Sequence, residues 1–339
     1  MKPFSVLTIL LLVVFLLLSS EFYSQNNNAP DYFIKGIDNP EDLIKVNGTD
    51  WAIVSSMVST KQSSGAIFAL NTKSESIMLL FRLINEQDNY DGLTHFSPHG
   101  IYLTQSSVGN YQLYVINHGS REAIEIFDLI IVDKLPKLKW KRHIDFPKNV
   151  WANGLVVDGD GSIYATSMYD PTESDFLQKF DKGNPTGQIW KWHKTKLEWQ
   201  PLLPTFFSGA NGIAISPNGE NLYVSEWARR KVHKISLAKK NITASATVGF
   251  LPDNIRWSIE GNLLIAGQNG RPVEVFESKG ISIKNMYFSI VEMSPETLKF
   301  EELIKGGGAD FANATVAMEA NNLYWVGCVQ NNKIAVYKK

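Results

Sequence analysis

The sequence predicts an all-β protein: a six-bladed β-propeller with four-stranded antiparallel blades around a central channel. From residue 35 onward, one pattern recurs six times: an apolar strand, a turn rich in Asn, Asp or Gly, a second apolar strand, and a further strand after a polar loop. Convincing amphipathic helices are scarce, with one short helix expected at 174–181. Strands at this spacing form antiparallel meanders, and repeats of roughly 40 to 60 residues with several strands each are typical of β-propellers.

The repeats follow one another without an interruption long enough to hold a second domain. Their first strands are expected at 43–46, 100–103, 154–157, 212–215, 254–257 and 315–318, and their second strands at 51–54, 113–118, 163–166, 222–226, 263–266 and 323–327. Their third strands are expected at 66–70, 124–127, 188–192, 231–235, 273–276 and 333–337. We therefore assign residues 35–339 to one propeller domain.

An excursion at residues 170–187 lies between strands of the third repeat. We interpret it as an insertion over one face of the propeller that forms a lid or a pocket wall; the alternative is a long surface loop.

Composition and charge narrow the class of protein. The chain is 44% hydrophobic and 20% charged, which is typical of a globular protein with a large core. It carries 33 Lys and Arg against 34 Asp and Glu, so no charge imbalance favours nucleic acid as a partner. A small or apolar ligand fits better.

The N-terminus resembles a targeting segment. Lys2 precedes an apolar run at residues 4–18, followed by serines and asparagines. Residues 1–25 are therefore expected to be a signal peptide of a secreted protein, or a retained hydrophobic anchor that associates the chain with a membrane. Glycosylation sequons at Asn47, Asn241 and Asn313 agree with export.

Cys328 is the single cysteine, so no intramolecular disulfide can form. It lies in an apolar strand-like run, where a buried thiol acting as a small hydrophobe is expected. Stability must then come from a large core or from bound metal.

Acids and asparagines collect just before the first strand of several repeats. They are Glu41, Asp42, Asn153, Asn211, Asp253 and Asn254. Equivalent ends of the innermost propeller strands face one channel, so these side chains are expected to converge there. Carboxylate and carboxamide oxygens are ligands that calcium prefers, and without a cation the carboxylates would repel one another. For Asn153-Gly154 and Asn211-Gly212 taken alone, the alternative is ordinary turn chemistry.

Two histidines mark the second repeat. His99 follows a proline at the expected start of one strand, and His118 ends the next, so a hairpin could bring them together. Histidine suits general acid–base chemistry near neutral pH. The alternative is a pair of hydrogen-bonded structural residues at strand ends.

From about Gly36 onward, the chain resembles the paraoxonases and related calcium-dependent arylesterase and lactonase propellers, within the gluconolactonase-like superfamily. The resemblance is carried by GIDNPEDL around Glu41, SPHGI around His99, LYVINH ending at His118, ANGL at Asn153, GANGIAISPNGENLYVSE at Asn211, and PDNI at Asp253.

The resemblance implies a catalytic calcium ion in the channel, with His99 as the base for water and His118 as its partner. The implied ligands of this ion are Glu41, Asn153, Asn211, Asp253 and Asn254. Asp42 and the backbone carbonyl of Ile101 would bind a second, structural calcium ion.

This chain departs from the family pattern at three places. Gly154 stands where the family has an aspartate for the second calcium ion. Cys328 has no partner for the disulfide that ties the first and last strands in mammalian members, so ring closure must rely on strand pairing. The segment after Thr166, apolar in mammalian members, is mostly polar here after residue 171.

These observations favour an exported calcium-dependent hydrolase of esters or lactones. Two alternatives stay open: a sugar lactonase, and a non-catalytic propeller that binds a ligand or partner and uses calcium for structure alone.

Overall fold

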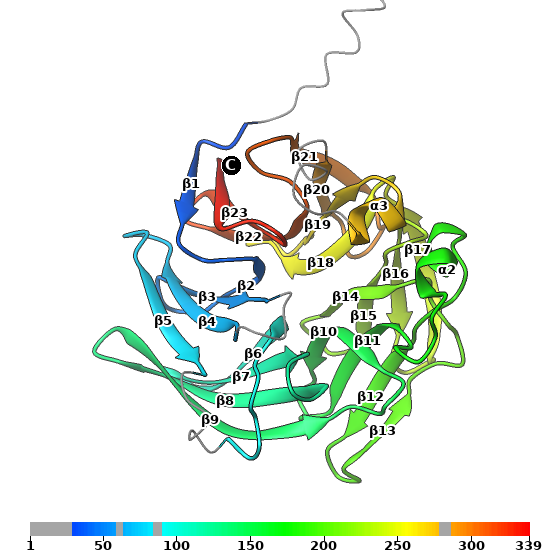
Figure 1. Cartoon of the computed structure of the whole chain (residues 1–339), viewed down its shortest axis with the longest axis horizontal. Coiled ribbons are helices and arrows are strands. Elements are labelled where there is room, and N and C mark those ends of the chain that lie inside the picture. The colour runs from blue at the N-terminus through cyan, green and yellow to red at the C-terminus, as the bar shows by residue number, and fades with distance from the viewer. Residues whose placement is uncertain (1–28, 59–63, 84–89, 278–285) are drawn as a thin grey trace, which may run out of the picture.

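A computed structural model describes residues 29–58, 64–83, 90–277 and 286–339. It confirms the predicted fold: six four-stranded antiparallel sheets surround a central channel (Figure 1). The expected targeting segment at residues 1–25 lies outside the described residues. Within the described part of the chain, no helix is long and apolar enough to cross a lipid bilayer.

The first three blades follow one another in chain order, each running from the channel outward. Blade 1 consists of β2 (Pro40–Lys45), β3 (Trp51–Ser56), β4 (Ala66–Asn71) and β5 (Ile77–Arg82). Blade 2 consists of β6 (Pro98–Ser107), β7 (Asn110–Asn117), β8 (Ala123–Val132) and β9 (Leu135–Asp145). Blade 3 consists of β10 (Trp151–Val157), β11 (Ile163–Tyr169), β12 (Ile189–His193) and β13 (Glu198–Pro201).

The last three blades complete the ring. Blade 4 consists of β14 (Ala210–Ile215), β15 (Asn221–Glu226), β16 (Lys231–Ser236) and β17 (Asn241–Thr247). Blade 5 consists of β18 (Leu251–Trp257), β19 (Leu263–Asn269), β20 (Tyr287–Met293) and β21 (Phe300–Gly307). Blade 6 consists of β22 (Ala314–Ala320), β23 (Leu323–Cys328), β24 (Lys333–Lys338) and β1 (Tyr32–Lys35).

Strand pairing closes the ring, as expected for a chain with a single cysteine. β1 is the outermost strand of blade 6 and pairs antiparallel with β24, with Tyr32 opposite Val336 and Lys35 opposite Lys333 (Figure 1). Cys328 is buried and its sulfur lies 3.8 Å from the Lys333 carbonyl oxygen. The N-terminal strand therefore holds the ring shut by backbone hydrogen bonds.

The core lies between the blades. Six apolar clusters of the described residues each join the facing surfaces of two neighbouring sheets. The tight turns between first and second strands carry left-handed residues, for example Gly48 (φ 74°) and Gly219 (φ 71°), because a short hairpin turn needs positive φ.

One predicted strand is wrong. Residues 273–276 form the helix α3 (Pro272–Phe276), and the third strand of blade 5 is β20. Pro272 fits the first turn of a helix, and Glu274 accepts a hydrogen bond from the backbone N–H of Arg271 at 3.1 Å. These local signals outweigh the alternating apolar pattern of this short segment.

The insertion at 170–187 contains the short helix α2 (Phe176–Asp181). Phe180 is fully buried in an apolar cluster with Met168, Tyr169 and Trp227. α2 also contacts α3, and Asp181 forms an ion pair with Arg271 (Figure 1). The insertion is therefore a packed part of one face of the propeller, and its described side chains support the wall of the channel mouth.

Candidate active site

The inner strands carry an irregularity that presents side chains to the channel. In all six blades, the pairing between the first and second strands shifts register near the beginning of the first strand. The shifts lie at Pro40/Asp42, Pro98/Ile101, Ala152/Leu155, Ala210/Ile213, Pro252/Ile255 and Ala314/Val316. Such bulges redirect side chains and are common beside active sites. The candidate metal ligands and His99 occupy these positions.

Glycines after the site residues let adjacent inner strands approach closely. A Cβ atom on Gly100 would lie 2.1 Å from the Asn153 carbonyl oxygen, and one on Gly212 would lie 2.2 Å from the Asp253 carbonyl oxygen. Asn153-Gly154 and Asn211-Gly212 therefore belong to bulged strands, and the alternative of ordinary turns is wrong for both pairs.

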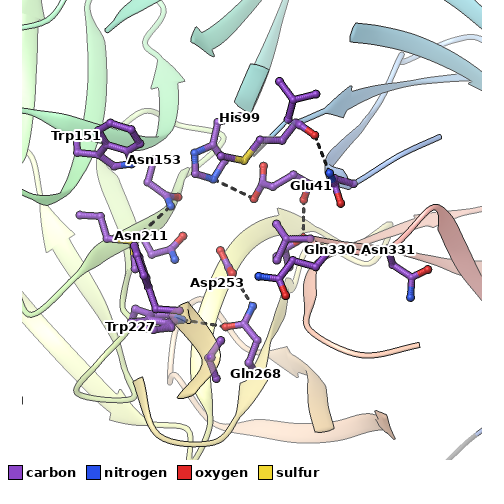
Figure 2. A pocket seen from close by; sticks show the side chains of 18 of the residues that line it. Glu41, His99, Trp151, Asn153, Asn211, Trp227, Asp253, Gln268, Gln330 and Asn331 are labelled. Atoms are coloured by element: carbon purple, nitrogen blue, oxygen red, sulfur yellow. Dashed lines mark hydrogen bonds and ion pairs between the residues drawn. The ribbon is translucent and has the colours of Figure 1, made fainter. Parts of the chain in front are cut away.

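One cavity of about 970 Å³ lies at the mouth of the channel, and Figure 2 shows its polar floor. Glu41, His99, Asn153, Asn211 and Asp253 all line it. They come from blades 1, 2, 3, 4 and 5, so residues up to 212 positions apart meet at one place.

Three oxygen atoms on this floor are buried and have no hydrogen-bond partner among the described residues: Glu41 Oε2, Asn153 Oδ1 and Asn211 Oδ1. An unpaired buried oxygen is costly, and three of them in one cavity are a donor set that could bind a cation. The described residues contain no cluster of three or more His, Cys, Asp or Glu side chains suited to a metal. The donors are instead two carboxylates with amide oxygens, a set that suits calcium.

The electrostatics of the channel agree with this interpretation. Burial, followed by the nearby charge of Glu41, raises the pKa of Asp253 to about 8. Burial lowers the pKa of His99, but the charges of Glu41, Asp253 and Asp42 outweigh it, so its net pKa is raised. The channel thus concentrates negative charge that a divalent cation would offset.

Other side chains fix the two carboxylates. Asn254 Nδ2 donates to Glu41 Oε1 at 2.8 Å. Gln268 Nε2 donates to Asp253 Oδ2 at 2.7 Å, while Gln268 Oε1 accepts a hydrogen bond from Trp227 Nε1 at 2.9 Å (Figure 2). Sequence reasoning missed Gln268, although a glutamine in the apolar strand 263–269 was an available signal.

The two histidines meet, as the hairpin prediction expected. His99 Nδ1 lies 2.7 Å from His118 Nε2, and His118 Nδ1 lies 2.7 Å from Glu122 Oε2. The second oxygen of Glu122 accepts a hydrogen bond from the Ala152 N–H at 2.8 Å. His118 also stacks on Trp151, with ring centroids 4.3 Å apart. Sequence reasoning missed Glu122; its spacing of four residues from His118 is the available signal.

The hydrogen bonds between His99, His118 and Glu122 determine which ring nitrogen of each histidine carries a proton. A carboxylate only accepts hydrogen bonds, so His118 carries its proton on Nδ1 and its Nε2 accepts from His99 Nδ1–H. His99 Nε2 lies on the cavity side, 3.4 Å from Glu41 Oε1, with which it forms an ion pair when the ring is protonated. With Nδ1 engaged by His118, Nε2 is the His99 nitrogen that can exchange a proton with the cavity.

Asp42 and Ile101 do not join this group. Both lie deeper in the channel, where Asp42 Oδ2 accepts a hydrogen bond from the Ile101 N–H at 2.9 Å. Arg256, which sequence reasoning did not single out, contacts both residues. The six acids and asparagines therefore do not converge on a single point, because Asp42 belongs to a separate set of contacts.

One part of the remaining wall of the cavity is aromatic and apolar: Met57, Trp151, Met168, Tyr169, Trp227, Val275 and Phe276. Another part is polar: Asp38, Asn39, Thr315, Gln330, Asn331 and Asn332. Tyr169 stacks on Phe176 of α2 with ring centroids 4.1 Å apart, so the insertion holds this wall in place. A polar floor with an apolar wall suits a ligand that carries one polar group on an apolar body.

Comparison with known proteins agrees with the fold. Residues 55–294 match the family model described as SMP-30/gluconolactonase/LRE-like region. Human serum paraoxonase/arylesterase 1 is 25% identical over 321 residues, which are 87% of this chain and 85% of that protein. Serum paraoxonase/arylesterase 2 of Gallus gallus is 28% identical over 66% of this chain and 64% of that protein. The solved structure of a luciferin-regenerating enzyme superposes with a TM-score of 0.56 at 14% identity, covering 91% of this chain and 95% of that one, which is a likeness of fold alone.

Proposed function

Because the chain belongs to the SMP-30/gluconolactonase/LRE-like family, we propose that it is a calcium-dependent hydrolase of carboxylic esters and lactones. One observation carries the proposal: three unpartnered buried oxygens share a cavity with a histidine whose Nε2 is on the cavity side, 3.4 Å from Glu41 Oε1. The first feature suits a cation and the second suits a base for water. The relatives named as paraoxonases/arylesterases agree with this chemistry.

Glu41, Asn153, Asn211 and Asp253 would hold the calcium ion. Asn254, expected from the sequence as a further ligand, is not among the residues that line the cavity, and with Gln268 it would instead orient the two carboxylates. When bound, calcium supplies a positive charge that polarises the substrate carbonyl and stabilises the oxyanion that forms on hydrolysis. The protein positions these donors on bulges of separate rigid strands, so the floor is organised before substrate binds.

The proton of the attacking water would pass to His99 Nε2. The positive charge that develops on His99 is stabilised through its Nδ1–H bond to His118, and His118 is held by Glu122. Glu122 would hold the tautomer of His118, as the carboxylate does in other carboxylate–histidine pairs. General-base catalysis of this kind contributes about 100-fold to 10,000-fold in rate.

The aromatic wall favours esters and lactones with apolar substituents over sugar lactones. Trp151, Tyr169, Trp227 and Phe276 can cover the body of such a substrate while its carbonyl lies on the polar floor. The hydroxyl groups of a sugar lactone would find no partner on these rings and could pair only with polar wall residues such as Asp38, Asn39 and Asn331.

The test is a panel of an aryl ester, an alkyl-substituted γ-lactone and gluconolactone, assayed with calcium and with chelator. We expect the first two to be hydrolysed and chelator to abolish the reaction. Gluconolactone turnover alone would identify a sugar lactonase, and no turnover despite bound calcium would identify a non-catalytic propeller.

His99→Gln is expected to lower kcat about 100-fold or more. Loss of a residue that only supports a metal ligand weakens metal binding by roughly 10-fold to 100-fold. Asp253→Asn alters a proposed ligand itself, so it is expected to weaken calcium binding by more than that. His143→Gln, on the outermost strand of blade 2, is the matched control and should keep the rate. A His99→Gln enzyme with undiminished rate would remove His99 from the mechanism and leave the calcium proposal standing.

A further inference from the structure

Arg256 crosses the channel beneath the cavity floor. It belongs to β18 of blade 5, yet its guanidinium group reaches blades 1 and 2. Its Nε donates to the Leu43 carbonyl oxygen at 2.8 Å, and one terminal nitrogen donates to both the Ile101 carbonyl oxygen, at 3.1 Å, and the Asp42 carboxylate. The other terminal nitrogen donates to the Ile255 carbonyl oxygen at 3.1 Å. Its side chain is 12% exposed, so most of this cation is shielded from solvent.

Asp42 and the Ile101 carbonyl oxygen are the two groups that the family resemblance directs to a second, structural calcium ion. In this chain the same oxygens already face a fixed positive charge. Both oxygens of Asp42 also accept backbone hydrogen bonds, from the N–H groups of Leu43 and Ile101, each at 2.9 Å. This contrasts with the first site, where Glu41 Oε2 has no partner.

The third ligand of such an ion is missing too. Gly154 stands where the resemblance implies an aspartate, and a Cβ atom there would lie 3.1 Å from the Asn211 carbonyl oxygen, with little space for a larger side chain. The residues present therefore do not fit a second calcium ion.

We propose that the Arg256 guanidinium group permanently takes the place of the second calcium ion, so that the channel is braced by a cation of the protein itself and no second ion binds. The inference rests on the proposed function only in assuming that a first calcium ion binds in the cavity. Arg256 contacts none of the residues proposed to bind that first ion. The inference is therefore tested by ion counting and thermal stability, and not by hydrolysis.

The first experiment counts calcium in the full-length protein by native mass spectrometry after equilibration with millimolar calcium. We expect no ion beyond the first, and a second specifically bound ion would overturn the inference. A count of zero would contradict the calcium dependence of the proposed function. It would still agree with the inference that Arg256 takes the place of the second ion.

The second experiment removes the cation. Arg256→Met keeps length but leaves the buried Asp42 carboxylate without its cationic partner, so Tm in chelator should fall by about 5 °C. Arg256→Met should also gain a calcium-dependent rise in Tm at millimolar concentrations that wild type lacks, because Asp42 and the Ile101 carbonyl are freed. Arg142→Met, on the exposed edge of blade 2, is the matched control and should leave Tm unchanged.

An Arg256→Met protein as stable as wild type, with no new calcium response, would overturn the inference. If Arg256→Met does not fold, the double variant Asp42→Asn/Arg256→Met removes both charges. It should recover folding, because the single variant fails through an unpaired buried charge. A double variant that also fails to fold would count against the charge-bracing role.

Discussion

Glu122→Gln is expected to lower kcat by about 100-fold or more while changing KM little. The amide can still accept the Ala152 N–H bond through its carbonyl oxygen, which turns its NH2 group toward His118 Nδ1. His118 must then carry its proton on Nε2, and His99 must move its own proton to Nε2, the nitrogen on the cavity side. The base would be lost although every side chain keeps its place.

The magnitude follows from the proton that His99 can no longer accept. A 100-fold loss corresponds to about 2.7 kcal/mol of transition-state stabilisation, and a fully wrong tautomer can cost about 10,000-fold. The cost in stability is smaller. Exchanging a charged hydrogen bond for a neutral one costs about 1–2 kcal/mol, which lowers Tm by about 2 °C in a chain of this size.

Steady-state kinetics on the best substrate of the panel, with calcium saturating, measure this effect. Glu198→Gln, on the exposed outer strand of blade 3, controls for loss of a carboxylate elsewhere and should match wild type. A Glu122→Gln enzyme with wild-type kcat would refute the tautomer argument. So would a loss confined to KM, because that would assign Glu122 to substrate binding.

Three further predictions concern the rest of the chain. In chelator, Tm should fall as pH rises from about 4 to about 8. Burial raises the pKa of Asp253 from 3.8 to about 8, so the folded state binds more protons than the unfolded state over this window. Calcium should flatten this dependence of Tm on pH, and a Tm that rises with pH in chelator would contradict the prediction. In the exported protein, glycan mapping should find sugar on Asn47 and Asn241, which are exposed, but not on Asn313, which is fully buried; a glycan on Asn313 of the folded protein would be incompatible with the structure. Burial raises the pKa of the Cys328 thiol, so a thiol reagent should react only after unfolding, and rapid labelling of the native protein would contradict that placement.

The fold could be predicted because its information is local and repeated. Turns such as Asn47-Gly48 and the alternating strands around them recur in every blade, and each repeat supports the interpretation of the others. The strand expected at 273–276 is wrong because a proline and a capping glutamate start a helix there, a signal that the apolar pattern of four residues does not contain.

The site was predictable where its residues share a position in the repeat. Glu41, Asn153, Asn211 and Asp253 all precede a first strand, so the topology alone brings them together. Glu122 and Gln268 act through single contacts that depend on side-chain direction, and no repeat position marks them.

Arg256 shows a different limit. Its partners lie 155 to 214 residues away, and within its own repeat it resembles any strand residue with a solvated side chain. Only the geometry of the channel reveals that it lies against Asp42. Conversely, Asp42 could not be separated from Glu41 by sequence, because neighbouring residues on a bulged strand can face different levels of the channel.

The most direct test of the central claim is a calcium titration of the chelated protein in which bound ion and hydrolysis rate are measured on the same samples. The orphaned oxygens of Glu41, Asn153 and Asn211 predict that the rate is negligible without calcium, rises in proportion to the ion bound, and saturates at one ion per chain. Full hydrolysis before any ion is bound, or a saturated site without hydrolysis of any ester or lactone in the panel, would contradict the account.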